Sequence, residues 1–232
     1  EMVQEKNLIF TPPEGFSDKM IDPEFTPTLY KMATEGFVFS NSYNCAWGGS
    51  TASGEYSNIT GNFYTTANCL KLSASKYQPW TLGNQFKKLG YKTVGYHNNS
   101  YTYYGRNKSH PNFGYQWKGV GNGLKFKYNG WPRSDKEMAE VTAGEYMGKN
   151  QPFHAYYMSV SGHANYSFDG NAMASRHKKD LPAKYADYPS DVRAFIACQY
   201  EVELMLQALV GRLEETGELE NTVFAMAADH YP

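Results

Sequence analysis

Short apolar runs alternate with helical patterns along the chain, and this alternation constrains the fold more than any other feature. The runs that we expect to be strands are 7–10 (NLIF), 91–97 (YKTVGYH), 152–160 (PFHAYYMSV) and 221–228 (NTVFAMAA). Strands separated by helices are typical of parallel sheets, because each parallel pair needs a crossover connection. The sequence therefore predicts an α/β fold with a mostly parallel sheet and helices on both faces. It shows no internal repeat and no linker, so we expect 1–232 to form a single domain.

Helix signals lie between these runs. We expect helices over 26–36, 79–90, 134–149 and 190–217. Thr26 is placed to cap the first of them, Pro27 suits its first turn, and Gly36 ends it. Ser134 and Glu137 have the spacing of a capping box, which predicts the start of the third.

The composition narrows the classes of function. A formal net charge of −1 offers no basic surface, so we expect no nucleic-acid partner. The 20 tyrosines, with abundant Asn, Ser and Gly, are typical of proteins that handle sugars or polyols, although Tyr also fills cores. Cys45, Cys69 and Cys198 lack a CxxC spacing, which argues against a cysteine zinc site. Cys45 can pair with Cys69, or both can be free buried thiols.

Polar and titratable residues follow each predicted strand. They are Glu14, His97 with Asn98 and Asn99, His163, and Asp229 with His230. In an open α/β sheet the ligand site lies beyond the carboxyl ends of the strands. We therefore expect these residues, although distant in sequence, to meet at one edge of the sheet.

The pair Asp229-His230 offers a carboxylate and an imidazole side by side, which is half of a metal-ligand set. Glu14 can add a third ligand and the Thr51 hydroxyl a fourth. This oxygen-rich set with one nitrogen suits one divalent ion, with Mn²⁺ as the first choice and Mg²⁺ or Zn²⁺ as alternatives. An isolated Asp-His pair is, however, more often a capped loop, and Glu14 alone is typical of a solvated turn.

Thr51 lies in the stretch GGSTASGEYS, residues 48–57, for which two interpretations compete. Clusters of Gly and Ser are typical of surface loops. Alternatively, Thr51 opens a helix at the tip of a tight turn. A metal and the helix N-terminus would there activate its hydroxyl as a nucleophile.

The segment 98–133 is rich in Asn, Gly, Tyr and Lys and has weak periodicity, so we expect a long functional loop. Within it, Arg106 is either a surface charge or a clamp for phosphate. Two histidines also have interpretations without a function. His97 can simply hydrogen-bond to its own backbone, and His163 can be a histidine of a surface loop. We assign no role to His110.

Six segments occur in an order that resembles the lipoteichoic acid synthases and related phosphoglycerol transferases of the alkaline phosphatase/sulfatase superfamily. They are NLIFTPPEGF, IDPEFTPTLYKMATEGFVFSNSYN, GGSTASGEY, GYKTVGYHNN, SGHANY and NTVFAMAADH. The resemblance runs from about residue 7 to the end of the chain. It implies that Glu14, Asp229 and His230 are metal ligands. It also implies that Thr51 touches the metal and is the nucleophile that carries the phosphoglycerol group during turnover.

The resemblance implies a substrate-binding shell as well. His163 matches a histidine that contacts the substrate phosphate and assists proton transfer, and Arg106 matches an arginine that binds the phosphoglycerol group. We place His97 in the same shell. Three positions depart from the family pattern: Tyr104 stands in place of a tryptophan, Asn99 in place of an aspartate near the head group, and Ser50 in place of a lysine before the threonine. These departures indicate that the head group can differ from plain glycerol phosphate.

The function implied is transfer of a phosphoglycerol-type group from a lipid donor to a glycolipid or cell-envelope polymer. The expected location is the extracellular face of the bacterial membrane, with membrane helices outside this chain and a domain truncated at both ends. A formylglycine sulfatase is disfavoured, because Cys45 lacks the following Pro and Arg. A phosphoethanolamine transferase and a non-catalytic glycan- or polyol-binding relative remain as alternatives.

Overall fold

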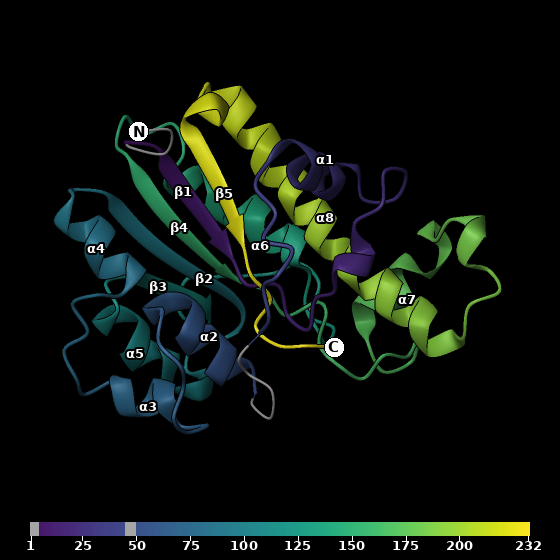
Figure 1. The fold of residues 1–232 in the computed structure, drawn as a ribbon, viewed down its shortest axis with the longest axis horizontal. Coiled ribbons are helices and arrows are strands. Elements are labelled where there is room, and N and C mark those ends of the chain that lie inside the picture. The colour runs from purple at the N-terminus through teal and green to yellow at the C-terminus, as the bar shows by residue number, and fades with distance from the viewer. Residues whose placement is uncertain (1–4, 45–49) are drawn as a thin grey trace.

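The computed structural model describes residues 5–44 and 50–232. Within them lies a five-stranded sheet in the order β3-β2-β4-β1-β5, and every pairing in it is parallel (Figure 1). The strands are β1 (Asn7–Thr11), β2 (Lys92–Ser100), β3 (Gln116–Val120), β4 (Phe153–Met158) and β5 (Thr222–Met226). All six residues of the central strand β4 are buried, as expected for a parallel strand covered on both faces. The predicted parallel α/β sheet is confirmed.

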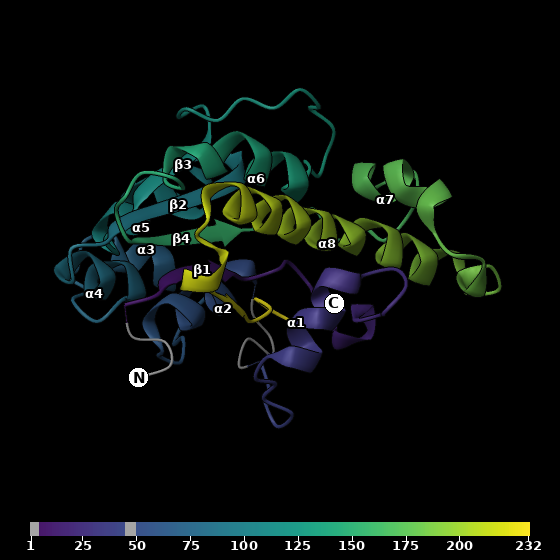
Figure 2. The same ribbon diagram turned by 90° about the horizontal axis from the view of Figure 1, so that it is seen from above.

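Helices cover both faces of the sheet, as predicted. One face carries α1 (Pro27–Glu35), α6 (Asp135–Thr142) and α8 (Ser190–Thr216), whose apolar residues pack in one cluster with β-strand residues such as Ile9 and Tyr157. The other face carries α2 (Thr51–Thr60), α3 (Cys69–Ser73), α4 (Leu82–Lys88) and α5 (Arg106–Asn112) around a second cluster that includes Phe10 and Tyr156. In Figure 2, α6 and α8 lie on the opposite side of the sheet from α2.

The remaining helices are short. α7 (Ala172–His177) packs on the N-terminal part of α8 through a small cluster that contains Met173, Ala174, Ala194 and Ala197. Single 3₁₀ turns occupy 18–20, 103–105, 143–145, 178–180, 183–185 and 219–221. Among the described residues, no helix combines the length and the apolar character that a membrane span requires.

The prediction of one long loop over 98–133 was wrong. β2 continues to Ser100, and α5 and β3 follow within the segment. Pro111 inside α5 and Gly119 inside β3 hid both elements, because proline and glycine usually mark the ends of helices and strands. His97 and Asn99 therefore lie within a strand and not in the loop after it.

The helix boundaries show which capping predictions held. Ser134 accepts a hydrogen bond from the Glu137 backbone N–H at 3.0 Å, as the capping box predicted. Thr26 precedes α1 as expected, but its hydroxyl donates to the Met20 carbonyl at 2.5 Å and does not cap the helix. The first amides of α1 are capped instead by Glu203 from α8, a contact between residues far apart in sequence.

Of the three cysteines, Cys69 and Cys198 are buried. Cys45 lies outside the described residues, so its pairing with Cys69 stays a prediction.

Candidate metal and nucleophile site

The carboxyl ends of β1 and β5 bring the predicted metal ligands together. These strands are neighbours in register, with Thr11 opposite Met226. Glu14 and Asp229 each come three residues later, so they emerge at the same edge of the sheet. Ligand atoms of Glu14, Asp229 and His230 all lie within 4.8 Å of one another.

The contacts within this cluster leave one buried oxygen unused. Asp229 Oδ1 accepts hydrogen bonds from the backbone N–H groups of Gly15 (2.9 Å) and His230 (2.8 Å). Asp229 Oδ2 is buried and makes no hydrogen bond to any residue that the structure describes, although His230 Nε2 lies 3.5 Å away. His230 Nε2 also lies 3.0 Å from Glu14 Oε1. A buried carboxylate oxygen that lacks a partner, beside a second carboxylate and an imidazole, fits a divalent cation.

The ionisation of these groups reflects the same concentration of negative charge. Burial, followed by the nearby Glu14 carboxylate, raises the pKa of Asp229 well above its ordinary value. The hydrogen bond to Glu14 is the main cause that raises the pKa of His230 to about 9. Protons thus compensate the two carboxylates in the metal-free protein, which is the role that a bound cation would take over.

Thr51 is the first residue of α2, and its hydroxyl donates to the Glu14 carboxylate, with oxygen–oxygen distances of 3.1 and 3.3 Å. The side chain of Ser50, at the N-cap position, makes no capping hydrogen bond, so it leaves the first amides of the helix uncapped. Thr51 therefore lies at the positive end of a ten-residue helix and beside the ligand cluster. Of the two interpretations of this stretch, the helix start describes the structure.

Gly54, three residues into α2, lets the helix approach the ligand cluster closely. A Cβ at this position would lie 1.6 Å from the Asp229 carbonyl oxygen and 2.8 Å from its Cα. Only glycine allows this contact between α2 and the backbone of Asp229. Two contacts that do not involve α2 hold the backbone of Glu14. Its N–H donates to Ser159 Oγ, and its carbonyl oxygen accepts from the Gln199 side-chain amide.

His163 lies in the loop after β4 and is partly exposed. Its Nδ1 is bonded to the Ala164 carbonyl oxygen, and its ring contacts Trp131 edge-on with centroids 5.3 Å apart. Within the described part of the chain it makes no hydrogen bond to the ligand cluster. Asp135 fixes the start of this loop, since one of its carboxylate oxygens accepts the Val160 N–H at 3.0 Å.

Arg106, predicted as a clamp or a surface charge, is only 1% exposed. Its Nε donates to Glu55 Oε2 at 2.8 Å, and its guanidinium lies over the Tyr104 ring at 5.1 Å. His97 is buried beside it, with Nε2 3.1 Å from an Arg106 terminal nitrogen. Burial, and then the Arg106 charge, lower the pKa of His97 to about 3, so its ring is neutral at pH 7. Arg106 is not a surface charge.

The side-chain oxygen of Asn99 accepts the Ser100 N–H at 2.7 Å, a local contact that does not involve His97 or Arg106. The buried neighbour Asn98 donates to Asp135 Oδ1, also at 2.7 Å. The structure thus joins His97, Tyr104 and Arg106 in one group and Glu14, Thr51, Asp229 and His230 in another.

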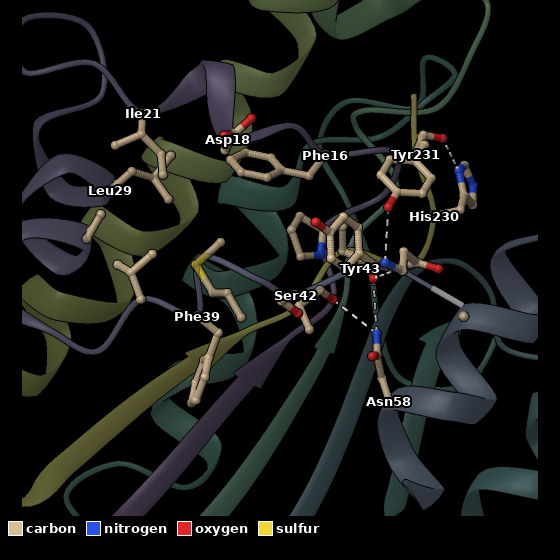
Figure 3. Close-up of a pocket in the computed structure, with 18 of the residues that line it drawn as sticks. Phe16, Asp18, Ile21, Leu29, Phe39, Ser42, Tyr43, Asn58, His230 and Tyr231 are labelled. Atoms are coloured by element: carbon tan, nitrogen blue, oxygen red, sulfur yellow. Dashed lines mark hydrogen bonds between the residues drawn. The ribbon is translucent and has the colours of Figure 1, made fainter. Parts of the chain in front are cut away.

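An apolar pocket of about 450 Å³ borders the ligand cluster on the β5 side (Figure 3). Its polar rim includes His230, Tyr231 and, from α2, Asn58, which donates to the Ala227 carbonyl oxygen at 3.0 Å. Its apolar part is formed by residues such as Ile21, Leu29, Phe39 and Met226. Figure 3 shows this part on the side away from His230.

Sequence reasoning missed three residues of the site: Gly54, Glu55 and Asp135. Glu55 follows Thr51 by four residues, which places both on one side of a helix. That spacing was the available signal. The partners of Glu55 and Asp135 come from distant segments, and no local pattern announces them.

Comparisons with known proteins show which proteins share this fold. The protein lipoteichoic acid synthase-like YvgJ of Bacillus subtilis (strain 168) is 23% identical over 239 residues, which cover 97% of this chain and 37% of that protein. The crystal structure of the lipoteichoic acid synthase LtaP from Listeria monocytogenes is similar with a TM-score of 0.81 at 22% identity, over 99% of this chain and 57% of that one. The Streptococcus pyogenes phosphoglycerol transferase GacH in complex with sn-glycerol-1-phosphate gives 0.67 at 16% identity, over 100% of this chain and 63% of that one.

The chain therefore spans a little over a third of YvgJ and more than half of LtaP. The resemblance to lipoteichoic acid synthases and phosphoglycerol transferases, first indicated by the sequence motifs, is confirmed. A protein-family model described as Sulfatase matches residues 16–232. The chain belongs to the sulfatase family.

Proposed function

We propose that this chain carries the catalytic site of a metal-dependent transferase that moves a phosphoglycerol-type group from a lipid donor to a glycolipid or cell-envelope polymer. The observation that supports it most is the buried cluster of Glu14, Asp229 and His230 with the Thr51 hydroxyl 3.1 Å from Glu14 at a helix start. The named activities of YvgJ, LtaP and GacH favour phosphoglycerol over other phosphoryl groups.

The proposed reaction has two displacements at phosphorus. In the first, a bond forms between Thr51 Oγ1 and phosphorus while the bond from phosphorus to the lipid oxygen breaks. The threonine proton passes to Glu14, the acceptor that the hydroxyl already contacts, and His163 protonates the departing lipid oxygen. In the second, an acceptor hydroxyl gives its proton to His163 and bonds to phosphorus while the bond to Thr51 Oγ1 breaks. Glu14 returns its proton to the departing threonine oxygen, which completes a ping-pong cycle.

Glu14, Asp229 and His230 would hold the metal, with Thr51 beside them. Mn²⁺ is the first choice, with Mg²⁺ and Zn²⁺ as alternatives, since the set combines carboxylate oxygens with one imidazole. The bound ion supplies positive charge that lowers the pKa of a contacting hydroxyl and offsets the charge on phosphoryl oxygens. Arg106 adds a fixed guanidinium for the same phosphoryl group. We place the reaction at the extracellular face of the membrane, where a lipid donor and a cell-envelope acceptor meet.

Thr51→Ala tests the nucleophile, with Thr51→Ser as its matched control. We expect Thr51→Ala to abolish transfer of glycerophosphate from phosphatidylglycerol while circular dichroism and metal content stay unchanged. Thr51→Ser keeps a hydroxyl at the same place and should retain measurable transfer. Wild-type-like turnover in Thr51→Ala would refute the mechanism. Metal binding without turnover in the wild-type protein would favour the non-catalytic binding relative.

A further inference from the structure

Glu55, one helical turn after Thr51, is at the centre of a fully buried polar network. Its Oε2 accepts from Arg106 Nε at 2.8 Å. Its Oε1 accepts from His110 Nε2 and from the Tyr156 hydroxyl, both at 3.0 Å. Burial alone would raise the pKa of Glu55, but the Arg106 charge together with the contacts to His110 outweighs burial and lowers the pKa to about 2. Glu55 is therefore an anion at neutral pH.

The network fixes two of the three nitrogens of Arg106 and leaves the third free. Nε is bonded to Glu55, and one terminal nitrogen lies 3.1 Å from His97 Nε2. The His97 ring donates through Nδ1 to the Met158 carbonyl oxygen at 2.8 Å, so its Nε2 accepts from Arg106. The second terminal nitrogen, NH2, is buried and has no hydrogen-bond partner among residues 5–44 and 50–232. A buried N–H group without a partner is costly, which indicates that a ligand oxygen satisfies it in the working enzyme.

The unpartnered nitrogen of Arg106 is connected through Glu55 to the helix that carries the proposed nucleophile, Thr51. Thr51 and Glu55 are four residues apart on α2, so they share one side of that helix. The guanidinium also lies over the Tyr104 ring, 5.1 Å from its centroid. The bond from Nε to Glu55 thus ties the guanidinium to the helix that begins with Thr51.

We propose that Glu55 is a positioning residue for phosphoryl transfer, which holds the Arg106 guanidinium so that its unpartnered nitrogen meets a phosphoryl oxygen of the substrate. This inference rests on the proposed function, because it assigns Arg106 the phosphoglycerol group as its ligand. One helix then supplies both the attacking hydroxyl and the carboxylate that orients the anion-binding arginine. Because Thr51 and Glu55 lie on the same helix, the spacing between them stays fixed while charge develops on the phosphoryl group.

The test measures binding of sn-glycerol 1-phosphate to the metal-loaded Thr51→Ala protein by calorimetry, so that turnover does not contribute. In this background we expect Arg106→Ala to weaken binding by about 10- to 100-fold, the range for a hydrogen bond to a charged group. Glu55→Gln should weaken it to a similar extent. The double variant Glu55→Gln/Arg106→Ala should bind no more weakly than Arg106→Ala, because both changes remove the same interaction.

Matched variants separate positioning from folding. Glu203→Gln removes another fully buried glutamate charge, one that caps α1, and it should leave binding unchanged. Glu55→Asp keeps the charge, so it should stay folded and recover part of the affinity that Glu55→Gln loses. Thermal unfolding and metal content are recorded for every variant, and Glu55→Asp replaces Glu55→Gln in the comparison if the latter does not fold.

Each contrary result has its own meaning. If Arg106→Ala weakens binding while both Glu55 variants bind like the parent, Glu55 does not position the arginine, and the proposed function stands. If Arg106→Ala binds like the parent, the arginine is not a phosphate ligand, and the inference fails while the roles of Thr51 and the metal remain. If the metal-loaded parent does not bind the probe, the phosphoglycerol substrate class fails as well.

Discussion

The contact between Gly54 and Asp229 leads to a specific prediction, because a single added methyl group at residue 54 would push α2 and the proposed metal ligand Asp229 apart. A Cβ at residue 54 would lie 1.6 Å from the Asp229 carbonyl oxygen, whereas ordinary contact begins at 3.4 Å. Either α2 or the 227–230 segment must therefore move by about 2 Å, since a packed interior has no free space to absorb the group. Asp229 is buried and fixed by the Gly15 N–H, so neither segment can move without disturbing the cluster.

Two opposing effects set the change in stability of Gly54→Ala. Alanine is favoured over glycine inside a helix by about 1 kcal/mol. Overpacking of a buried position costs about 1–3 kcal/mol, and the backbone atoms of Asp229 cannot rotate away as a side-chain end could. We therefore expect a net loss in the free energy of unfolding of about 0–2 kcal/mol. We expect a larger effect on metal affinity, because the distances from a metal ion to its ligands tolerate changes of only about 0.2 Å.

The assay compares Mn²⁺ affinity by calorimetry and stability by urea denaturation. Gly54→Ala should bind Mn²⁺ at least about 10-fold more weakly than wild type. Gly211→Ala is the control, because Gly211 also lies within a helix but a Cβ there meets nothing within 4 Å. It should stabilise the protein by up to about 1 kcal/mol and leave the metal affinity unchanged. Wild-type Mn²⁺ affinity in Gly54→Ala would refute the close approach of α2 to the ligand cluster.

Two further predictions concern His230 and Asp135. The metal-free protein should lose stability as the pH rises from 6.5 through 9, because Glu14 raises the pKa of folded His230 to about 9 and the stabilising proton is lost over that range. Urea titrations in EDTA would show this slope, and an equal slope in His230→Gln would contradict its origin. Asp135→Ala should lower the free energy of unfolding by about 1–3 kcal/mol, because the Val160 and Ser161 amides lose an acceptor. A loss below about 0.5 kcal/mol by urea denaturation would show that these bonds contribute little.

Local patterns were sufficient to predict four of the five strands and the grouping of Glu14, Asp229 and His230. Apolar runs followed by Glu14 and by Asp229-His230 imply neighbouring strand ends, because strands of a parallel sheet deliver their following residues to one edge. The register of β1 with β5 then places both carboxylates at equal distance past the strands. The topology thus brings Glu14 and Asp229 to one edge of the sheet, and long-range contacts such as the Gly15 N–H to Asp229 then hold them there.

Contacts between distant residues explain what the sequence did not reveal. Thr26 has the residue type and place of a helix cap, yet Glu203 from α8 takes that role, which depends on how α8 packs. Arg106 follows a tyrosine-rich, glycine-containing stretch typical of a surface loop. Its burial depends on the ion pair with Glu55 of α2, a residue 51 positions earlier in the chain, and no local spacing indicates that contact.

The central claim is that Thr51 carries the transferred group between donor and acceptor. The most direct measurement is peptide mass spectrometry of the protein after incubation with Mn²⁺ and phosphatidylglycerol and rapid acid quenching. We predict a glycerophosphate adduct on the peptide that contains Thr51, and its absence from the Thr51→Ala protein. A metal-loaded wild-type protein that transfers glycerophosphate to an acceptor without any adduct at Thr51 would contradict the two-step mechanism.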